Sequence, residues 1–170
     1  MIIMGIDPGT ILMGYGFLES NAQDFTAVSF GAIATPKKAT PAEKLGHLHR
    51  ELLILVDRYQ PEVVAIEQPF VAKNVRSAIS IGRAQAVAML AAAERGLPAF
   101  EYTPSQVKQR VASHGAASKE QVQEMVRWQL GLSEIPEPND AADALAVAIC
   151  HACEAHASSL LEREISGGAL

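Results

Sequence analysis

The sequence predicts an α/β domain in which helices flank a mixed five-stranded sheet. Three expected strands follow one another near the N-terminus, and later strands alternate with helices. This alternation is typical of a sheet with helices packed against it. In addition, two of the expected strands, residues 2–7 and 62–67, each end in an acidic residue. If they are parallel neighbours, both carboxylates point into one cleft at the carboxyl edge of the sheet.

The first strand is a short apolar run that ends at Asp7, and the Pro8-Gly9 that follows is typical of a turn. A simple interpretation is that Asp7 is a turn aspartate that hydrogen-bonds its own backbone. Glu67 favours the cleft instead, because it also ends an apolar run that a proline stops.

The next two strands complete an antiparallel meander. Residues 12–19 alternate small and large side chains, which suits a strand paired with the first, and residues 25–35 form the third strand. Thr40 then begins a helix over residues 41–59, with Pro41 at its first position and Glu43 in a capping box.

The second half of the chain is mainly helical. A helix over residues 77–95 is rich in alanine and glycine, which suits either a core helix or a symmetric dimer seam. A strand at 98–102 and helices at 105–113 and 118–130 follow.

Asn139 caps a last helix in which Asp140 and Asp143 share one face. The simpler alternative is that these two acids only interact with the helix dipole. We expect a single domain over residues 1–157 and a flexible C-terminal tail over 158–170.

Composition indicates a cytoplasmic protein without membrane contact. The 170 residues suffice for one domain, and 49% of them are hydrophobic. The first strand starts without a basic leader, and no apolar run is long enough to span a bilayer. The net charge of −5 argues against a general polyanion binder but allows a basic face. Cys150 and Cys153 lack a second pair of zinc ligands, so we interpret them as reduced thiols.

The loop at 70–76 places an aromatic residue beside cationic and amide side chains. Phe70 lies near Lys73, Asn74 and Arg76, a mixture that suits stacking on bases and contact with phosphates. The alternative is a core phenylalanine flanked by solvated charges.

Five motifs together resemble the RuvC family of bacterial Holliday-junction resolvases, and the order of elements resembles a ribonuclease-H-like fold. The resemblance covers about residues 1–156. The motifs are Gly5-Ile6-Asp7-Pro8-Gly9, Ile66-Glu67-Gln68 with Phe70, Ala72-Lys73-Asn74, Gln106-Val107-Lys108-Gln109, and Asp140-Ala141-Ala142-Asp143-Ala144-Leu145-Ala146. The first motif alone would also fit sugar kinases and actin-like ATPases.

The resemblance implies a DNA endonuclease with named catalytic residues. It makes four acids the metal ligands, namely Asp7, Glu67, Asp140 and Asp143, with two Mg²⁺ expected per subunit and Mn²⁺ as the alternative. It makes Lys108 and Lys119 basic residues of the site and Phe70 the residue that meets bases at the junction. The implied partners are a four-way DNA junction, a second copy of the chain, and the branch-migration proteins RuvA and RuvB.

Physical chemistry agrees with this assignment. Four ionised carboxylates cannot crowd together without a cation, because like charges raise one another's pKa. Oxygen ligands suit Mg²⁺ or Mn²⁺, and two such ions promote in-line phosphodiester hydrolysis. In this family the products carry a 5′-phosphate and a 3′-hydroxyl and can be ligated. The expected DNA contacts are Phe70, Lys73, Asn74, Arg76, Arg83, Lys108, Arg110 and Lys119.

Three other functions compete with junction resolution. An actin-like ATPase needs two such lobes, and this chain supplies one. A junction binder without catalysis gains nothing by pointing four acids at phosphate. A nuclease acting on RNA–DNA hybrids is less favoured, because Phe70 suits splayed bases.

Overall fold

The computed structural model describes residues 1–21, 24–68 and 75–167, without the side chains of 161–167. In these ranges one sheet has the strand order β3-β2-β1-β4-β5. β1 (Ile2–Asp7), β2 (Leu12–Asn21) and β3 (Asp24–Ala34) form the antiparallel meander. β4 (Val63–Glu67) runs parallel to β1, and β5 (Ala99–Tyr102) runs parallel to β4. The predicted mixed sheet is confirmed.

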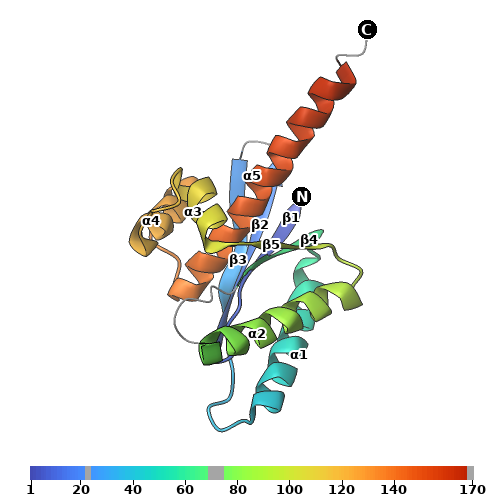
Figure 1. The fold of residues 1–170 in the computed structure, drawn as a ribbon, viewed down its shortest axis with the longest axis vertical. Coiled ribbons are helices and arrows are strands. Elements are labelled where there is room, and N and C mark those ends of the chain that lie inside the picture. The colour runs from blue at the N-terminus through green and yellow to red at the C-terminus, as the bar shows by residue number, and fades with distance from the viewer. Residues whose placement is uncertain (22–23, 69–74, 168–170) are drawn as a thin grey trace.

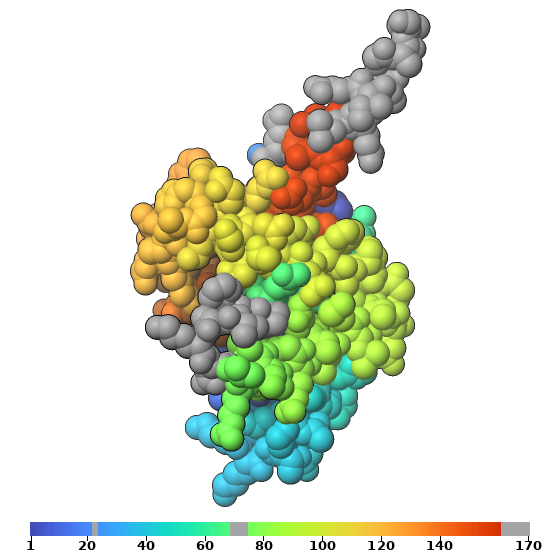
Figure 2. Space-filling view, in the orientation of Figure 1, coloured from blue at the N-terminus to red at the C-terminus, as the bar shows by residue number. Residues whose placement is uncertain are grey.

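Helices cover both faces of the sheet (Figure 1). One face carries α1 (Pro41–Tyr59) and α2 (Val75–Glu94). The other carries α3 (Pro104–Ala112), α4 (Lys119–Gln129) and α5 (Asn139–Gly167). In the space-filling view, α3 and α4 (yellow to orange) lie on the opposite side of the visible face from α1 and α2 (Figure 2).

α5 continues into the segment 158–170, for which the sequence predicts a flexible tail. It reaches Gly167 and extends beyond the edge of the sheet (Figure 1). Leucine, glutamate and arginine, all good helix formers, occupy this stretch. Residues 158–167 are therefore helical. No helix in the described part of the chain is long and apolar enough to cross a bilayer.

Capping residues fix the starts of the helices that frame the site. Thr103 and Ser118 each form a capping box at the start of α3 and α4, and Thr40 does the same for α1. Side-chain acceptors at these positions satisfy backbone N–H groups that a helix start leaves without partners. Lys108 on α3 and Lys119 on α4 are thereby held on short helices with defined starts.

Alternation along β1 and β4 decides which way their terminal acids point. Ile3 and Val63 are buried toward α5, whereas Met4 and Val64 are buried toward α1 and α2. Successive side chains of a strand point to opposite faces. Asp7, four residues after Ile3, and Glu67, four after Val63, therefore belong to the face that α5 covers.

Glycines in the central strands let α5 lie close to the sheet. A Cβ atom on Gly5 would overlap the backbone carbonyl of Ala144, and one on Gly14 would overlap that of Asp140. Glycine inside a strand often marks such close approach of another backbone segment. The first turns of α5, which carry Asp140 and Asp143, are therefore seated directly over β1 and β2.

Candidate active site

Asp7 and Glu67 are neighbours at the carboxyl edge of the sheet. Ile6 of β1 lies opposite Ile66 of β4 in a parallel register, so the two acids follow side by side. The two carboxyl groups are close enough for the charge of Glu67 to raise the pKa of Asp7. The prediction that β1 and β4 are parallel neighbours is confirmed, and their terminal carboxylates lie side by side at one edge of the sheet.

Asp140 and Asp143 complete an electrostatic cluster with these two acids. Burial and the nearby charges of Glu67, Asp143 and Asp140 raise the pKa of Asp7 to about 8. Burial, followed by the charge of Asp143, also raises the pKa of Glu67. Carboxylates at close range disfavour one another's ionised forms, most strongly where water is excluded. The helix-dipole interpretation of the two aspartates is thus insufficient, because they interact with the strand acids across the chain.

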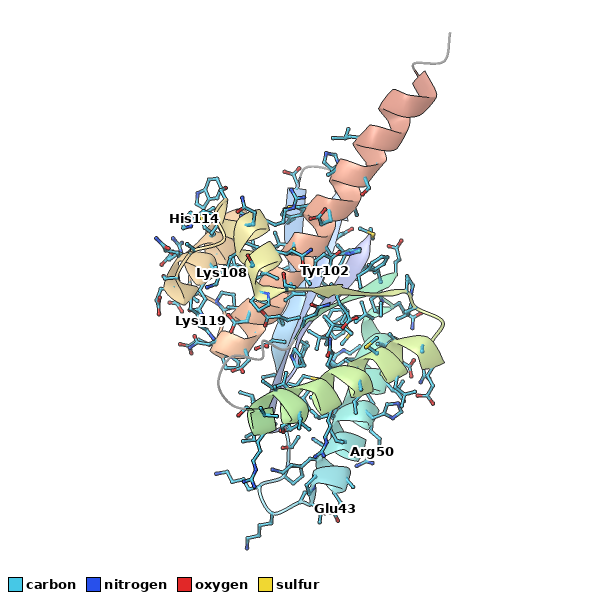
Figure 3. All side chains as sticks on the ribbon, viewed as in Figure 1. Glu43, Arg50, Tyr102, Lys108, His114 and Lys119 are labelled. Atoms are coloured by element: carbon cyan, nitrogen blue, oxygen red, sulfur yellow. The ribbon has the colours of Figure 1, made fainter. Side chains whose placement is uncertain are left out.

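Two lysines lie beside the acids. The Lys119 Nζ atom lies 2.5 Å from Asp143 Oδ2, and the Asp143 side chain is only 21% exposed. Lys108 lies on α3 close enough for its charge to lower the pKa of Glu67. In Figure 3 both lysines lie where α3, α4 and the start of α5 meet. Burial lowers the pKa of Lys119, but its hydrogen bond to Asp143 and the charges of Asp143, Asp7 and Asp140 outweigh burial and raise it.

A cavity of about 270 Å³ opens between these groups. Its polar lining includes Glu67, Lys108, Lys119 and Asp143. Its apolar lining comes from Pro104, Val107, Val122 and Ala146. Acids and lysines thus share one hollow, with acids that suit a cation and lysines that suit a phosphate.

The chain matches one protein family along most of its length. The family model for crossover junction endodeoxyribonuclease RuvC matches residues 3–151. The chain belongs to the RuvC family. A RuvC of Dehalococcoides mccartyi is 54% identical over 151 residues, which cover 89% of this chain and 90% of that protein. A RuvC of Desulfitobacterium hafniense is 49% identical over 170 residues and is covered completely, as is this chain.

A solved RuvC structure has the same fold. Thermus thermophilus RuvC in complex with a Holliday junction substrate superposes with a TM-score of 0.88 at 38% sequence identity. The match covers 93% of this chain and 96% of that one. The ribonuclease-H-like, mixed five-stranded architecture expected from the sequence is therefore that of the RuvC family.

The acid cluster fits a hard divalent cation by its donor chemistry. All four side chains offer carboxylate oxygens, and burial, followed by the charges of neighbouring acids, raises the pKa of Asp7 and Glu67. In residues 1–21, 24–68 and 75–167, however, no group of three or more His, Cys, Asp or Glu side chains is drawn together tightly enough to hold an ion. The ammonium of Lys119 supplies a counter-charge to Asp143 instead. The cluster thus interacts through its charges without closing into a cage.

The other predicted DNA contacts are dispersed. Arg76 and Arg83 are exposed on α2. Arg110 forms an ion pair with Glu154 on α5, in which its Nε atom lies 2.7 Å from Glu154 Oε1. Phe70, Lys73 and Asn74 lie outside the described residues.

Sequence reasoning did not single out two features of this site. The first is Gly14, which has no side chain and so lets the backbone of Asp140 lie close to β2. The feature of the sequence that indicates this close approach is a glycine inside a predicted strand. The second feature is Thr10, whose Oγ1 lies 2.8 Å from Ser80 Oγ on α2. No local pattern predicts that second contact, because it joins residues 70 positions apart.

Proposed function

We propose that this chain is a cytoplasmic, homodimeric endonuclease that resolves four-way DNA junctions in recombination and repair. It does so by metal-dependent hydrolysis of two paired phosphodiester bonds. The observation that carries the proposal is the Asp7 carboxyl, whose pKa is raised to about 8 by burial and by three further acids at one edge of the sheet. The name and junction complex of the Thermus thermophilus relative support the choice of substrate.

In this proposal Asp7, Glu67, Asp140 and Asp143 hold the divalent ions, two per subunit, with Mg²⁺ preferred and Mn²⁺ as the alternative. When bound, such ions activate a water and stabilise the leaving oxygen of the cleaved bond. The chain itself contributes the placement of the four acids: Asp7 and Glu67 by adjacent parallel strands, Asp140 and Asp143 by one face of α5. The products are nicks with a 5′-phosphate and a 3′-hydroxyl.

Lys119 is the catalytic lysine of this proposal, and Lys108 binds the phosphate group. Lys119 contacts Asp143 directly, so its ammonium reaches the region where charge develops during hydrolysis. Lys108 lines the same cavity from α3. Both positive charges lower the cost of bringing a phosphodiester toward four acids.

DNA binding in this proposal also uses Arg76 and Arg83 on α2, Arg110, and the 70–74 segment with Phe70, Lys73 and Asn74. Phosphate contacts of this kind position a nucleic acid without reading its sequence. Phe70 stacks on bases at the junction point.

An exposed apolar stripe on α2 is the proposed dimer surface. Helical spacing aligns five of its residues on the face turned away from the sheet, namely Val75, Ile79, Ala86, Leu90 and Ala93. The opposite face is buried through Ala84, Ala88 and Ala91. A two-fold dimer built on this stripe provides one site for each of the two paired cuts. RuvA and RuvB are further partners by family membership.

The test is cleavage of a synthetic mobile four-way junction beside a matched duplex and an RNA–DNA hybrid, each with Mg²⁺ and with EDTA. Paired, ligatable nicks in the junction alone, lost in EDTA, are expected. Binding without cleavage in Mg²⁺ and Mn²⁺ would instead indicate a junction-binding protein.

A further inference from the structure

A second hollow lies on the other side of the acid cluster from the lysines. This cavity of about 370 Å³ is bounded by the β1–β2 turn, by α2 and by the start of α5. It is lined by Gly9, Thr10, Ile11, Leu12, Ser77, Ser80, Ile81 and Asp140. Asp140 faces this hollow, while Asp143, one helical turn later, faces the lysine-lined cavity. The acids therefore stand between two hollows of different chemistry.

The walls of this second hollow are built and held in place. Thr10 Oγ1 and Ser80 Oγ lie 2.8 Å apart and tie the turn to α2. The buried Thr35 hydroxyl donates to the Thr10 carbonyl at 2.8 Å, and the Thr35 N–H donates to the Ile11 carbonyl at 2.9 Å. A turn anchored from two sides presents its hydroxyl in a fixed position, which lowers the entropy cost of binding.

Two positively charged side chains lie near Ser80 along α2. Arg76 and Arg83 lie four residues before and three residues after Ser80, so they flank it on one side of α2. Both are exposed, and neither forms an ion pair with any residue in the described ranges. Ile11, whose side chain stands at the rim, is 74% exposed and offers an apolar contact for a sugar.

We propose that this groove holds the sugar–phosphate backbone of the cleaved DNA strand on the side of the scissile phosphate away from Lys108 and Lys119. An endonuclease cuts within a strand, so the strand must continue across the site in both directions. One direction passes the lysine-lined cavity, and the other passes the hydroxyls of Thr10 and Ser80. Hydroxyls and arginines bind backbone oxygens without selecting a base. This inference rests on the proposed function.

Opposite charges placed at Ser80 test the proposal. Single-turnover cleavage of a four-way junction over a range of protein concentrations gives an apparent Kd and a maximal rate separately. We expect Ser80→Glu to raise the apparent Kd about tenfold and Ser80→Lys to lower it about twofold or more, since a charge beside phosphate changes binding by roughly this much.

Matched controls separate binding from folding. Ser158→Glu and Ser158→Lys place the same charges on an exposed position of α5 and should leave the apparent Kd unchanged. Thr10→Val removes a hydroxyl at nearly constant shape and should weaken junction binding a few-fold, whereas Thr26→Val on β3 should not. Thermal melting of every variant identifies any that unfold.

Two results would overturn the inference. If Ser80→Glu and Ser80→Lys shift the apparent Kd equally and in the same direction, binding depends on the size of the side chain at this position and not on its charge near a phosphate. No shift from Ser80→Glu and Thr10→Val would show that the strand passes elsewhere. In both cases the unsubstituted protein still cleaves junctions. A failure of the proposed function would instead appear as no junction cleavage by that protein.

Discussion

The Lys119 ammonium forms an ion pair with Asp143, at 2.5 Å, within a cluster that contains three further carboxylates. Its positive charge, together with that of Lys108, acts on Asp7 and Glu67, whose ionisation is opposed by burial and by the neighbouring acids. The balance between these charges controls both the stability of the site and the chemistry proposed for it.

We expect Asp7→Asn to abolish cleavage and to leave junction binding intact or tighter. The substitution removes a carboxylate from the centre of the cluster together with a negative charge that faces phosphate. A loss of metal-assisted rate of about a thousandfold or more is expected. Gel-based cleavage and fluorescence binding assays measure the two effects separately. An equal loss of binding and cleavage would contradict the assigned role.

The same acid predicts how stability depends on pH in EDTA. The pKa of Asp7 is about 8 in the folded chain against 3.8 for an unperturbed aspartate. Between these values the folded state keeps a proton that the unfolded state releases, so stability falls as pH rises from about 4 to about 8. The raised pKa of Glu67 acts in the same direction.

Asp7→Asn should therefore melt at a higher temperature than the unsubstituted chain. The difference in melting temperature should increase up to about pH 8 and exceed about 2 °C there. Thermal scans at several pH values measure it. A difference in melting temperature that is constant across these pH values, or of opposite sign, would argue against an electrostatic origin of the stabilisation.

Substitution of the two lysines should distinguish their roles. Lys119→Met should lower the maximal cleavage rate about a hundredfold, because Lys119 touches Asp143 and stabilises charge that develops in the reaction. Lys108→Met should mainly weaken binding, because Lys108 lines the cavity without a direct contact to an acid among the described residues. Lys44→Met on α1 is the control. Equal effects of both substitutions on the maximal rate would reject this division of roles.

The α2 stripe predicts the oligomeric state. Leu90→Asp places a charge on a stripe leucine that is 55% exposed, and it should convert a dimer into a monomer in light scattering after size exclusion. Leu160→Asp is a matched control on α5, where the leucine is 46% exposed, and should leave the dimer intact. If Leu90→Asp stays dimeric, the interface lies elsewhere.

Gly14→Ala tests the close packing of α5 against β2. Its added methyl group would overlap the backbone carbonyl of Asp140, so the first turn of α5 must shift. We expect a loss of about 1–3 kcal/mol of stability together with weaker cleavage. Gly46→Ala in α1 is the control, since its methyl group meets only Arg50 Nη1, at 3.4 Å. Alanine there should stabilise the helix by about 0.5–1 kcal/mol. Chemical denaturation measures both values.

The order of elements and the two strand acids could be predicted from local patterns. An apolar run of strand length followed by turn residues places Asp7 and Glu67 at strand ends whatever the rest of the chain does. Capping boxes likewise mark the starts of helices from a few neighbouring residues, as Thr40 and Ser118 show. The family resemblance added which of the many acids belong together.

The polar composition of residues 158–170 predicts a flexible tail, whereas α5 continues to Gly167. Leucine, glutamate and arginine in this segment favour a helix. Polarity indicates exposure, and an exposed segment can still be helical.

The sequence by itself determined which residues end the strands, begin the helices and supply carboxylates or positive charge, because these depend on neighbours along the chain. Only the tertiary structure decided that Lys119 pairs with Asp143, that Arg110 pairs with Glu154, and that Thr10 meets Ser80. Each of these contacts joins segments far apart in sequence. The two ion pairs depend on α5, which packs closely on glycines of the sheet. The contact between Thr10 and Ser80 depends on α2, which lies beside the first turn. Packing geometry of this kind has no local signature.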